Sequence, residues 1–165
     1  MQGSSDTQKR RRLYSNGSQQ VDKIRLGFIG LGGRGSGLAD LVGAMEDVQI
    51  AAVCDVYEDR VEKKRARLEE LTGHRPEGYL DYRELLARGD LQGVVIASSW
   101  TTHVEISLAA MRAGLYAACE VGGASSIQEC WELVQVSEET GVPFMLLENC
   151  CYCREEMAIL NMVKQ

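Results

Sequence analysis

Residues 24–55 read IRLGFIGLGGRGSGLADLVGAMEDVQIAAVCD, and this stretch decides the fold. An apolar run, Ile24–Ile29, leads directly into a glycine-rich turn of the form G-x-G-x-x-G at residues 30–35. A helix-like segment follows the turn, and a second apolar run, Val48–Cys54, ends on Asp55. Strand, glycine turn, helix and strand in this order predict a βαβ unit that binds a dinucleotide.

The glycines and the terminal acid have separate roles in such a unit. We expect Gly30 to allow the tight turn out of the strand, and Gly32 to let a pyrophosphate approach the backbone. Gly35 should let the helix pack closely on the strand, so that its N-terminal N–H groups face the phosphates. Asp55 lies twenty residues after Gly35, where its carboxylate can accept hydrogen bonds from the adenosine ribose hydroxyls.

Beyond this unit, apolar strand-like runs alternate with amphipathic helical segments. The expected helices lie at Tyr57–Leu71, near Arg83–Arg88, from Val104 to Gly114, from Ile127 to Gly141 and at Arg154–Lys164. The other expected segments are a short one at Tyr79–Tyr82 and strands at Gly93–Ser98, Leu115–Cys119 and Pro143–Leu147. This alternation predicts the α/β class, with a Rossmann-type doubly wound parallel sheet and right-handed crossovers.

Apolar stripes on the expected helices indicate which side chains face the core. Tyr57, Val61, Leu68 and Leu71 share one stripe of the helix that follows Asp55. Trp131 falls on a similar stripe in the fourth of those helices, and we expect it to be buried.

The composition is that of an ordinary globular protein. The chain has 165 residues, of which 45% are hydrophobic and 25% charged, and its formal net charge is −6. No apolar run approaches the roughly 20 residues that cross a bilayer, and the net negative charge argues against a nucleic-acid surface.

Residues 1–22 are polar and basic without an apolar core, so we interpret them as a disordered leader rather than a secretory signal. We expect a cytoplasmic protein with no nucleic-acid or membrane partner.

Six cysteines are present, and without an export signal we expect them to be reduced. Cys54 and Cys119 lie in predicted buried strands, where a free cysteine acts as a small hydrophobe. Cys150, Cys151 and Cys153 include a C-x-x-C spacing before a helix, a placement typical of redox sites. A metal site would need a further ligand, so we predict no metal and leave the role of this cluster open.

Four features carry a resemblance to a known family: GFIGLGGRG at 27–35, VCD at 53–55, IASSWTTH at 96–103 and Glu120 at the end of the fifth strand. From about Lys23 to Gln165 the chain resembles the N-terminal NAD-binding domain of the Gfo/Idh/MocA oxidoreductases. The segment from Glu129 to Gln165 is similar to the NAD-dependent α-N-acetylgalactosaminidase branch, which has a comparable LENCCY stretch.

The resemblance implies NAD as the cofactor and a set of contact residues. The implied pyrophosphate contacts are the glycine turn, with Gly30, Gly32, Gly33, Arg34 and Gly35, and Asp55 is the implied adenosine ribose contact. The implied contacts along the cofactor and at its nicotinamide end are Trp100, Thr101, Thr102, His103, Glu120, Val121 and Asn149.

Four of these residues have structural alternatives. His103 could instead be a polar residue in the first turn of a helix, and Trp100 could simply cover the core. Asn149 could also be a helix N-cap. Glu120 could instead cap the turn that contains Gly122 and Gly123.

The sequence departs from the family pattern after the fifth strand. Many members carry Glu-Lys-Pro there, with the lysine active in proton transfer, whereas this chain has Glu120-Val121-Gly122. The glycosidase-like branch also has an apolar second residue, Glu-Val-Pro, although Gly122-Gly123 differs from that pattern too. Since Val121 cannot transfer a proton, simple alcohol oxidation by that route is in question.

Three functions follow as hypotheses. The first is the NAD-binding domain of an oxidoreductase that acts on a sugar or polyol by hydride transfer. The second is a redox-neutral NAD-dependent glycosidase, and the third is a non-catalytic dinucleotide-binding fragment. The chain ends at Gln165 inside a helical pattern, so we expect a second, sheet-containing substrate domain beyond it. The catalytic residues should lie in that domain, the fragment alone should be inactive, and homo-oligomer formation by the full-length protein is left open.

Overall fold

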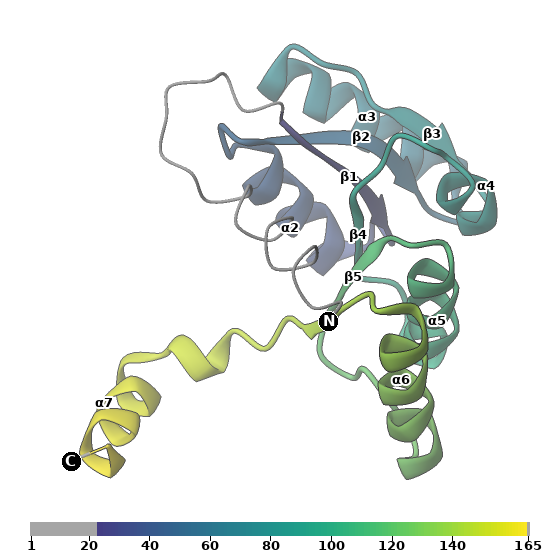
Figure 1. Cartoon of the computed structure of the whole chain (residues 1–165). Coiled ribbons are helices and arrows are strands. Elements are labelled where there is room, and N and C mark those ends of the chain that lie inside the picture. The colour runs from purple at the N-terminus through teal and green to yellow at the C-terminus, as the bar shows by residue number, and fades with distance from the viewer. Residues whose placement is uncertain (1–22, 165) are drawn as a thin grey trace, which may run out of the picture.

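Six parallel strands form one sheet in the computed structural model, which describes residues 23–164. The strands are β1 (Ile24–Ile29), β2 (Val48–Cys54), β3 (Glu77–Tyr79), β4 (Gly93–Ile96), β5 (Tyr116–Cys119) and β6 (Phe144–Leu146). Their spatial order is β3-β2-β1-β4-β5-β6, so the chain moves outward from β1 in one direction and then returns to continue in the other (Figure 1). This doubly wound parallel sheet confirms the predicted Rossmann-type fold class.

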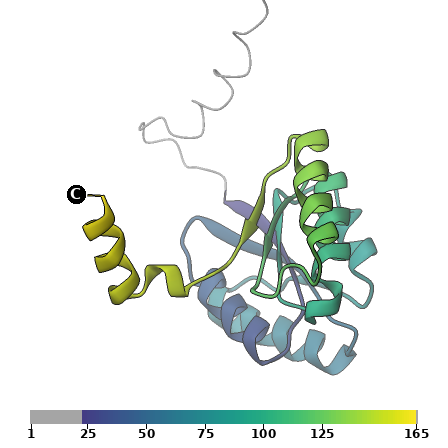
Figure 2. The same ribbon diagram turned by 90° about the horizontal axis from the view of Figure 1, so that it is seen from below.

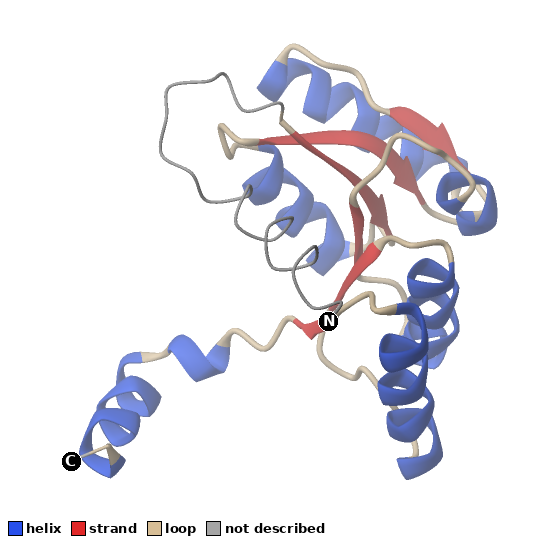
Figure 3. Cartoon of the chain, in the orientation of Figure 1, coloured by secondary structure: helices blue, strands red, loops and turns tan. Residues whose placement is uncertain are grey.

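Helices cover both faces of the sheet, as Figure 3 shows by colour. They are α2 (Gly33–Gly43), α3 (Glu58–Thr72), α4 (Tyr82–Leu86), α5 (His103–Arg112), α6 (Ile127–Thr140) and α7 (Arg154–Val163), with 3₁₀ turns η2 (Trp100–Thr102) and η3 (Cys150–Tyr152). One apolar cluster, which includes Phe28, Val53 and Leu68, joins the sheet to α2 and α3. The other, which includes Ile96 and Met111, joins it to α4, α5 and α6.

A register shift between β1 and β2 affects which side chains of the second strand share a face of the sheet. Leu26 pairs with Ile50 and Gly27 with Ala52, so Ala51 is an additional residue in β2. As a result, Ile50 and Val53 belong to the core beneath α2 and α3, while their neighbours belong to the core on the opposite face. Both faces of this strand are buried, as is typical of a parallel sheet.

The element boundaries differ slightly from those expected. The strand β3 begins at Glu77, earlier than the segment predicted from Tyr79, and α4 begins at Tyr82 rather than near Arg83. The side chain of Asp81 accepts a hydrogen bond from the backbone N–H of Arg83 and so caps α4. The predicted leader, residues 1–22, lies outside the described residues. Among residues 23–164, no helix has the length and apolar composition needed to cross a bilayer.

The predicted burial of Trp131 is wrong, since its side chain is 66% exposed. The helix α6 turns Leu133 and Val136 toward the sheet instead. Likewise, Tyr57 and Leu71 are exposed, although the other two members of their predicted stripe are buried. A helical period identifies an amphipathic helix, but two adjacent apolar stripes leave its rotation about its own axis undetermined.

Lys64 on α3 is a buried charge that the apolar pattern did not indicate. Its ammonium donates hydrogen bonds to Asp40 Oδ1 at 2.7 Å and to the Ser36 carbonyl oxygen at 2.8 Å. Both partners lie on α2, so this interaction ties the two helices together on one face of the sheet. The last helix, α7, extends away from the sheet in two perpendicular views (Figures 1 and 2), and its side chains are exposed.

Candidate cofactor site

The carboxyl ends of β1 and β4 mark the point where the strand order reverses. From β1 the chain enters α2 on one face of the sheet, and from β4 it enters α5 on the other. A cavity of about 750 Å³ opens beside these ends. Its lining includes Gly30 and Gly32 after β1, Asp55 after β2, and Ser98 and Thr102 after β4. Ligands of doubly wound sheets bind at such a crevice.

Two glycines of the turn are required by the fold itself. Gly30 has a φ of +92°, and a Cβ there would lie 2.5 Å from backbone atoms of Ala97 and Ser98. A Cβ on Gly35 would lie 2.0 Å from the carbonyl oxygen of Gly30. No rearrangement of a flexible side chain could relieve either contact, because backbone atoms make them. Gly30 therefore lets the turn pass directly against the end of β4, and Gly35 lets α2 pack directly against the end of β1.

The other two glycines leave space free instead. A Cβ on Gly32 would meet only the Arg60 guanidinium, at 4.0 Å, and a Cβ on Gly33 would meet nothing within 4 Å. Gly32 is the N-cap of α2 and supplies no side-chain cap, and the first turn holds no acidic residue. The first N–H groups of a helix have no intrahelical partner, so this bare terminus fits the phosphates of a dinucleotide.

Asp55 is 7% exposed and is anchored by backbone donors. The N–H of Leu31 donates to its Oδ2 at 2.7 Å, and the N–H of Tyr57 donates to its Oδ1 at 3.1 Å. The Arg60 guanidinium lies 3.8 Å from Oδ1 and stacks 4.4 Å from the centre of the Tyr57 ring. A carboxylate oxygen can accept more than one hydrogen bond, so ribose hydroxyls could still bind here. The sequence did not indicate that this acid also ties the glycine turn to the loop after β2.

The loop after β4 carries four of the expected contact residues. Trp100, Thr101 and Thr102 form the 3₁₀ turn η2, and Thr102 lines the cavity. Trp100 is 69% exposed and does not cover the core. Its ring packs on Gly122, where φ is +88° and an added Cβ would lie 2.7 Å from the ring. Trp100 therefore joins the loop after β4 to the loop after β5.

His103 begins α5, and its ring is 1% exposed. Its Nε2 lies 3.1 Å from the carbonyl oxygen of Ser98, while Nδ1 has no hydrogen-bond partner among the described residues. The ring faces the interior and is not part of the cavity lining. Contact between His103 and a cofactor stays a prediction.

Glu120 follows β5 and is 8% exposed. Its Oε1 accepts hydrogen bonds from Arg34 Nε at 3.1 Å and from Arg34 Nη2 at 3.0 Å. Arg34 Nη2 also donates to Asn149 Oδ1 at 3.4 Å. Among the described residues, only Arg34 donates to the Glu120 carboxylate, so this acid does not cap the turn through Gly122. Asn149 precedes η3, but its side chain forms no capping bond there.

The cysteines fall into two groups. Burial raises the pKa of the Cys54 thiol to about 12 and that of the Cys119 thiol to about 11, so both stay protonated as small core residues. Cys150, Cys151 and Cys153 are exposed and unpaired. A hydrogen bond with Glu148 raises the pKa of Cys150, which disfavours its thiolate. Within residues 23–164, no three potential ligand side chains converge to hold a metal ion.

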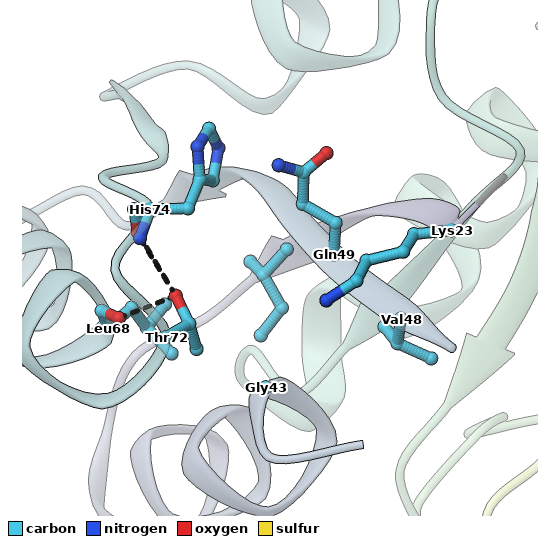
Figure 4. A pocket seen from close by; sticks show the side chains of 8 residues that line it. Lys23, Gly43, Val48, Gln49, Leu68, Thr72 and His74 are labelled. Atoms are coloured by element: carbon cyan, nitrogen blue, oxygen red, sulfur yellow. Dashed lines mark hydrogen bonds between the residues drawn. The ribbon is translucent and has the colours of Figure 1, made fainter. Parts of the chain in front are cut away.

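Two further hollows lie away from the strand ends described above. Figure 4 shows the smaller, about 50 Å³, where Thr72 Oγ1 accepts a hydrogen bond from the His74 N–H and donates one to the Leu68 carbonyl oxygen. It lies at the amino-terminal edge of the sheet and is too small for a dinucleotide. The larger, about 590 Å³, lies between α6 and β6 and is lined mainly by apolar side chains such as Leu133 and Phe144.

The fold and the bare helix terminus define a dinucleotide-binding Rossmann domain. The family model described as "Oxidoreductase family, NAD-binding Rossmann fold" matches residues 24–147, and the chain belongs to this family. The match confirms the predicted family and NAD as the cofactor. Which residues contact NAD stays a prediction.

Two relatives are similar over most of this chain. A "Glycosyl hydrolase family 109 protein" of Solibacter usitatus is 39% identical over 169 residues, covering 99% of this chain and 37% of the relative. "Glycosyl hydrolase family 109 protein 1" of Akkermansia muciniphila is 36% identical, covering 93% of this chain and 33% of the relative. The chain therefore spans only about a third of the length of these relatives.

Solved structures share the fold at lower identity. Scyllo-inositol dehydrogenase from Lactobacillus casei in its apo form has a TM-score of 0.80 and 19% identity, covering 89% of this chain and 43% of that chain. The same enzyme with bound NAD(H) and scyllo-inositol has a TM-score of 0.79. At this level of identity the similarity establishes the fold alone.

The two kinds of glycine should respond differently to substitution. Gly35→Ala should destabilise the chain severely, since its Cβ would overlap the Gly30 carbonyl oxygen. Gly32→Ala should leave stability almost unchanged, because its Cβ would enter open space, yet weaken NAD binding by obstructing the phosphates. Urea unfolding and calorimetric titration of NAD measure the two effects. A folded Gly35→Ala chain of wild-type stability, or full NAD affinity in Gly32→Ala, would contradict this assignment.

Proposed function

We propose that this chain is the cofactor-binding part of an enzyme that transfers a hydride between NAD and a carbon of a sugar or polyol. The observation that carries the proposal is the uncapped N-terminus of α2, which opens beside a cavity of about 750 Å³ at the switch point of the sheet. The family match supports NAD as the ligand of this cavity.

In this proposal the chain binds the cofactor along the carboxyl edge of the sheet. The N–H groups at Gly33 and Arg34 hold the pyrophosphate, and Asp55 accepts from the adenosine ribose. Thr102 lines the cavity. Glu120 and Asn149, which share Arg34 as a hydrogen-bond donor, would contact the nicotinamide end. Bound NAD supplies the hydride acceptor, and this chain holds it in a fixed orientation.

A redox-neutral glycosidase is the second candidate. Two observations favour it: the apolar Val121 beside Glu120, and the similarity to relatives named as glycosyl hydrolases. In that activity the hydride would return to the sugar within each turnover, so NADH would not accumulate. In a protein that joins this domain to a substrate domain, release of nitrophenol from a nitrophenyl glycoside without net NADH would favour the glycosidase. Net NADH from a polyol would favour the dehydrogenase.

We further propose how the domains are organised and in which cellular compartment the protein acts. Residues 23–165 bind the cofactor, while a separate substrate domain carries the catalytic groups, so the 165-residue chain alone should bind NAD without turnover. The six unpaired cysteines support a reducing, cytoplasmic environment. The expected substrate is a small sugar-like molecule, and a homo-oligomer of the full-length protein remains compatible with this proposal.

The charge of Asp55 should select NAD over NADP. A buried carboxylate beside the ribose would repel a 2′-phosphate, although Arg60 at 3.8 Å offsets part of that repulsion. Calorimetric titration should therefore give a tighter dissociation constant for NAD. Asp55→Ala should weaken NAD binding, narrow the difference between the cofactors, and cost about 1–3 kcal/mol of stability by leaving the buried Leu31 N–H unpaired. Tighter binding of NADP by the wild-type chain would refute the proposal.

A further inference from the structure

Arg34 connects three separate loops at the carboxyl edge of the sheet. It lies in the first turn of α2, after β1, and it donates to Glu120 after β5 and to Asn149 after β6. Two of its nitrogens, Nε and Nη2, converge on a single carboxylate oxygen, Glu120 Oε1. The sequence resemblance implied a pyrophosphate contact for Arg34, whereas its guanidinium is engaged with an acid at the other end of the expected cofactor.

The environment of the Arg34–Glu120 pair is asymmetric. The Glu120 side chain is 11% exposed, while that of Arg34 is 55% exposed. Burying an isolated carboxylate costs free energy, because the group loses its hydration. The hydrogen bonds from the Arg34 guanidinium offset part of this cost for Glu120. The second oxygen of Glu120, Oε2, accepts no hydrogen bond from a described residue. One oxygen is therefore held by the protein, and the other keeps its capacity to accept.

We propose that Arg34 is a positioning residue, which holds the Glu120 carboxyl group in one orientation so that Oε2 accepts a hydrogen bond from a hydroxyl of the nicotinamide half of NAD. This inference rests on the proposed function, because it needs NAD to lie along this edge. The first turn of α2 then acts on both parts of the cofactor. Its N–H groups bind the phosphates, and its arginine side chain fixes the acid that orients the nicotinamide ribose.

A double-mutant cycle with two ligands tests this role. Calorimetry measures the dissociation constants of NAD and of ADP, which shares the adenosine and pyrophosphate but lacks the nicotinamide ribose. Arg34→Met and Glu120→Gln should each weaken NAD binding about tenfold and change ADP binding less than twofold. The double variant should bind NAD no more weakly than the weaker single variant, because both substitutions remove the same interaction.

Arg60→Met is the matched control, since Arg60 lies beside Asp55 at the adenosine end. It should change NAD and ADP affinity by the same factor. Arg34→Lys keeps the charge but cannot place two N–H groups on one oxygen, so it should restore only part of the NAD affinity. It also provides the test if Arg34→Met does not fold.

The outcomes separate the inference from the proposed function. Equal losses of NAD and ADP affinity in Arg34→Met, together with wild-type NAD affinity in Glu120→Gln, would make Arg34 a pyrophosphate contact and overturn the positioning role. Additive losses in the double variant would also overturn it. A wild-type chain that binds neither ligand would refute the proposed function itself, and the inference with it.

Discussion

The close approach of α2 to the end of β1 is the constraint on which the site depends. Because Gly35 has no side chain, the helix rests against the carbonyl oxygen of Gly30, where a Cβ would lie only 2.0 Å from that oxygen. This contact places the helix terminus, which has no side-chain cap among residues 23–164, at the switch point of the sheet. It also fixes Leu31 and Arg34, whose donors hold the two buried acids Asp55 and Glu120.

The two acids share an organisation that the separate motifs do not reveal. Asp55 follows β2 and Glu120 follows β5, on opposite sides of β1 in the sheet, yet each is anchored by a donor from the four residues 31–34. The glycine turn therefore does more than admit phosphates. It fixes the two acids relative to each other, and in the proposed complex with NAD each acid would bind one end of the cofactor, as hydride transfer requires of a binding domain. This arrangement would serve a dehydrogenase and a redox-neutral glycosidase equally. Which of the two activities the protein has therefore depends on its proton-transfer groups, and Val121 occupies the position where many family members carry a lysine.

The fold could be predicted from the sequence because its determinants are local. Apolar runs, helical periods and the glycine turn each specify an element, and the right-handed crossover rule leaves few ways to assemble them. What failed or was missed depends on tertiary contacts. The exposure of Trp131 depends on how α6 is rotated, and the burial of Lys64 depends on Asp40 from another helix. The Arg34–Glu120 pair joins residues that are 86 positions apart, and no spacing rule indicates such a partnership.

The most direct test of this account is a map of backbone amide chemical shifts as NAD is added to the chain. The account predicts that the largest changes lie at the N-terminus of α2, at Gly32, Gly33 and Arg34, with further changes at Leu31 and at Glu120. The N–H groups at the start of α2 would bind the phosphates, while the Leu31 N–H holds Asp55 and the Arg34 side chain holds Glu120. Chemical-shift changes confined to the apolar hollow between α6 and β6, with no change in the glycine turn, would contradict this account.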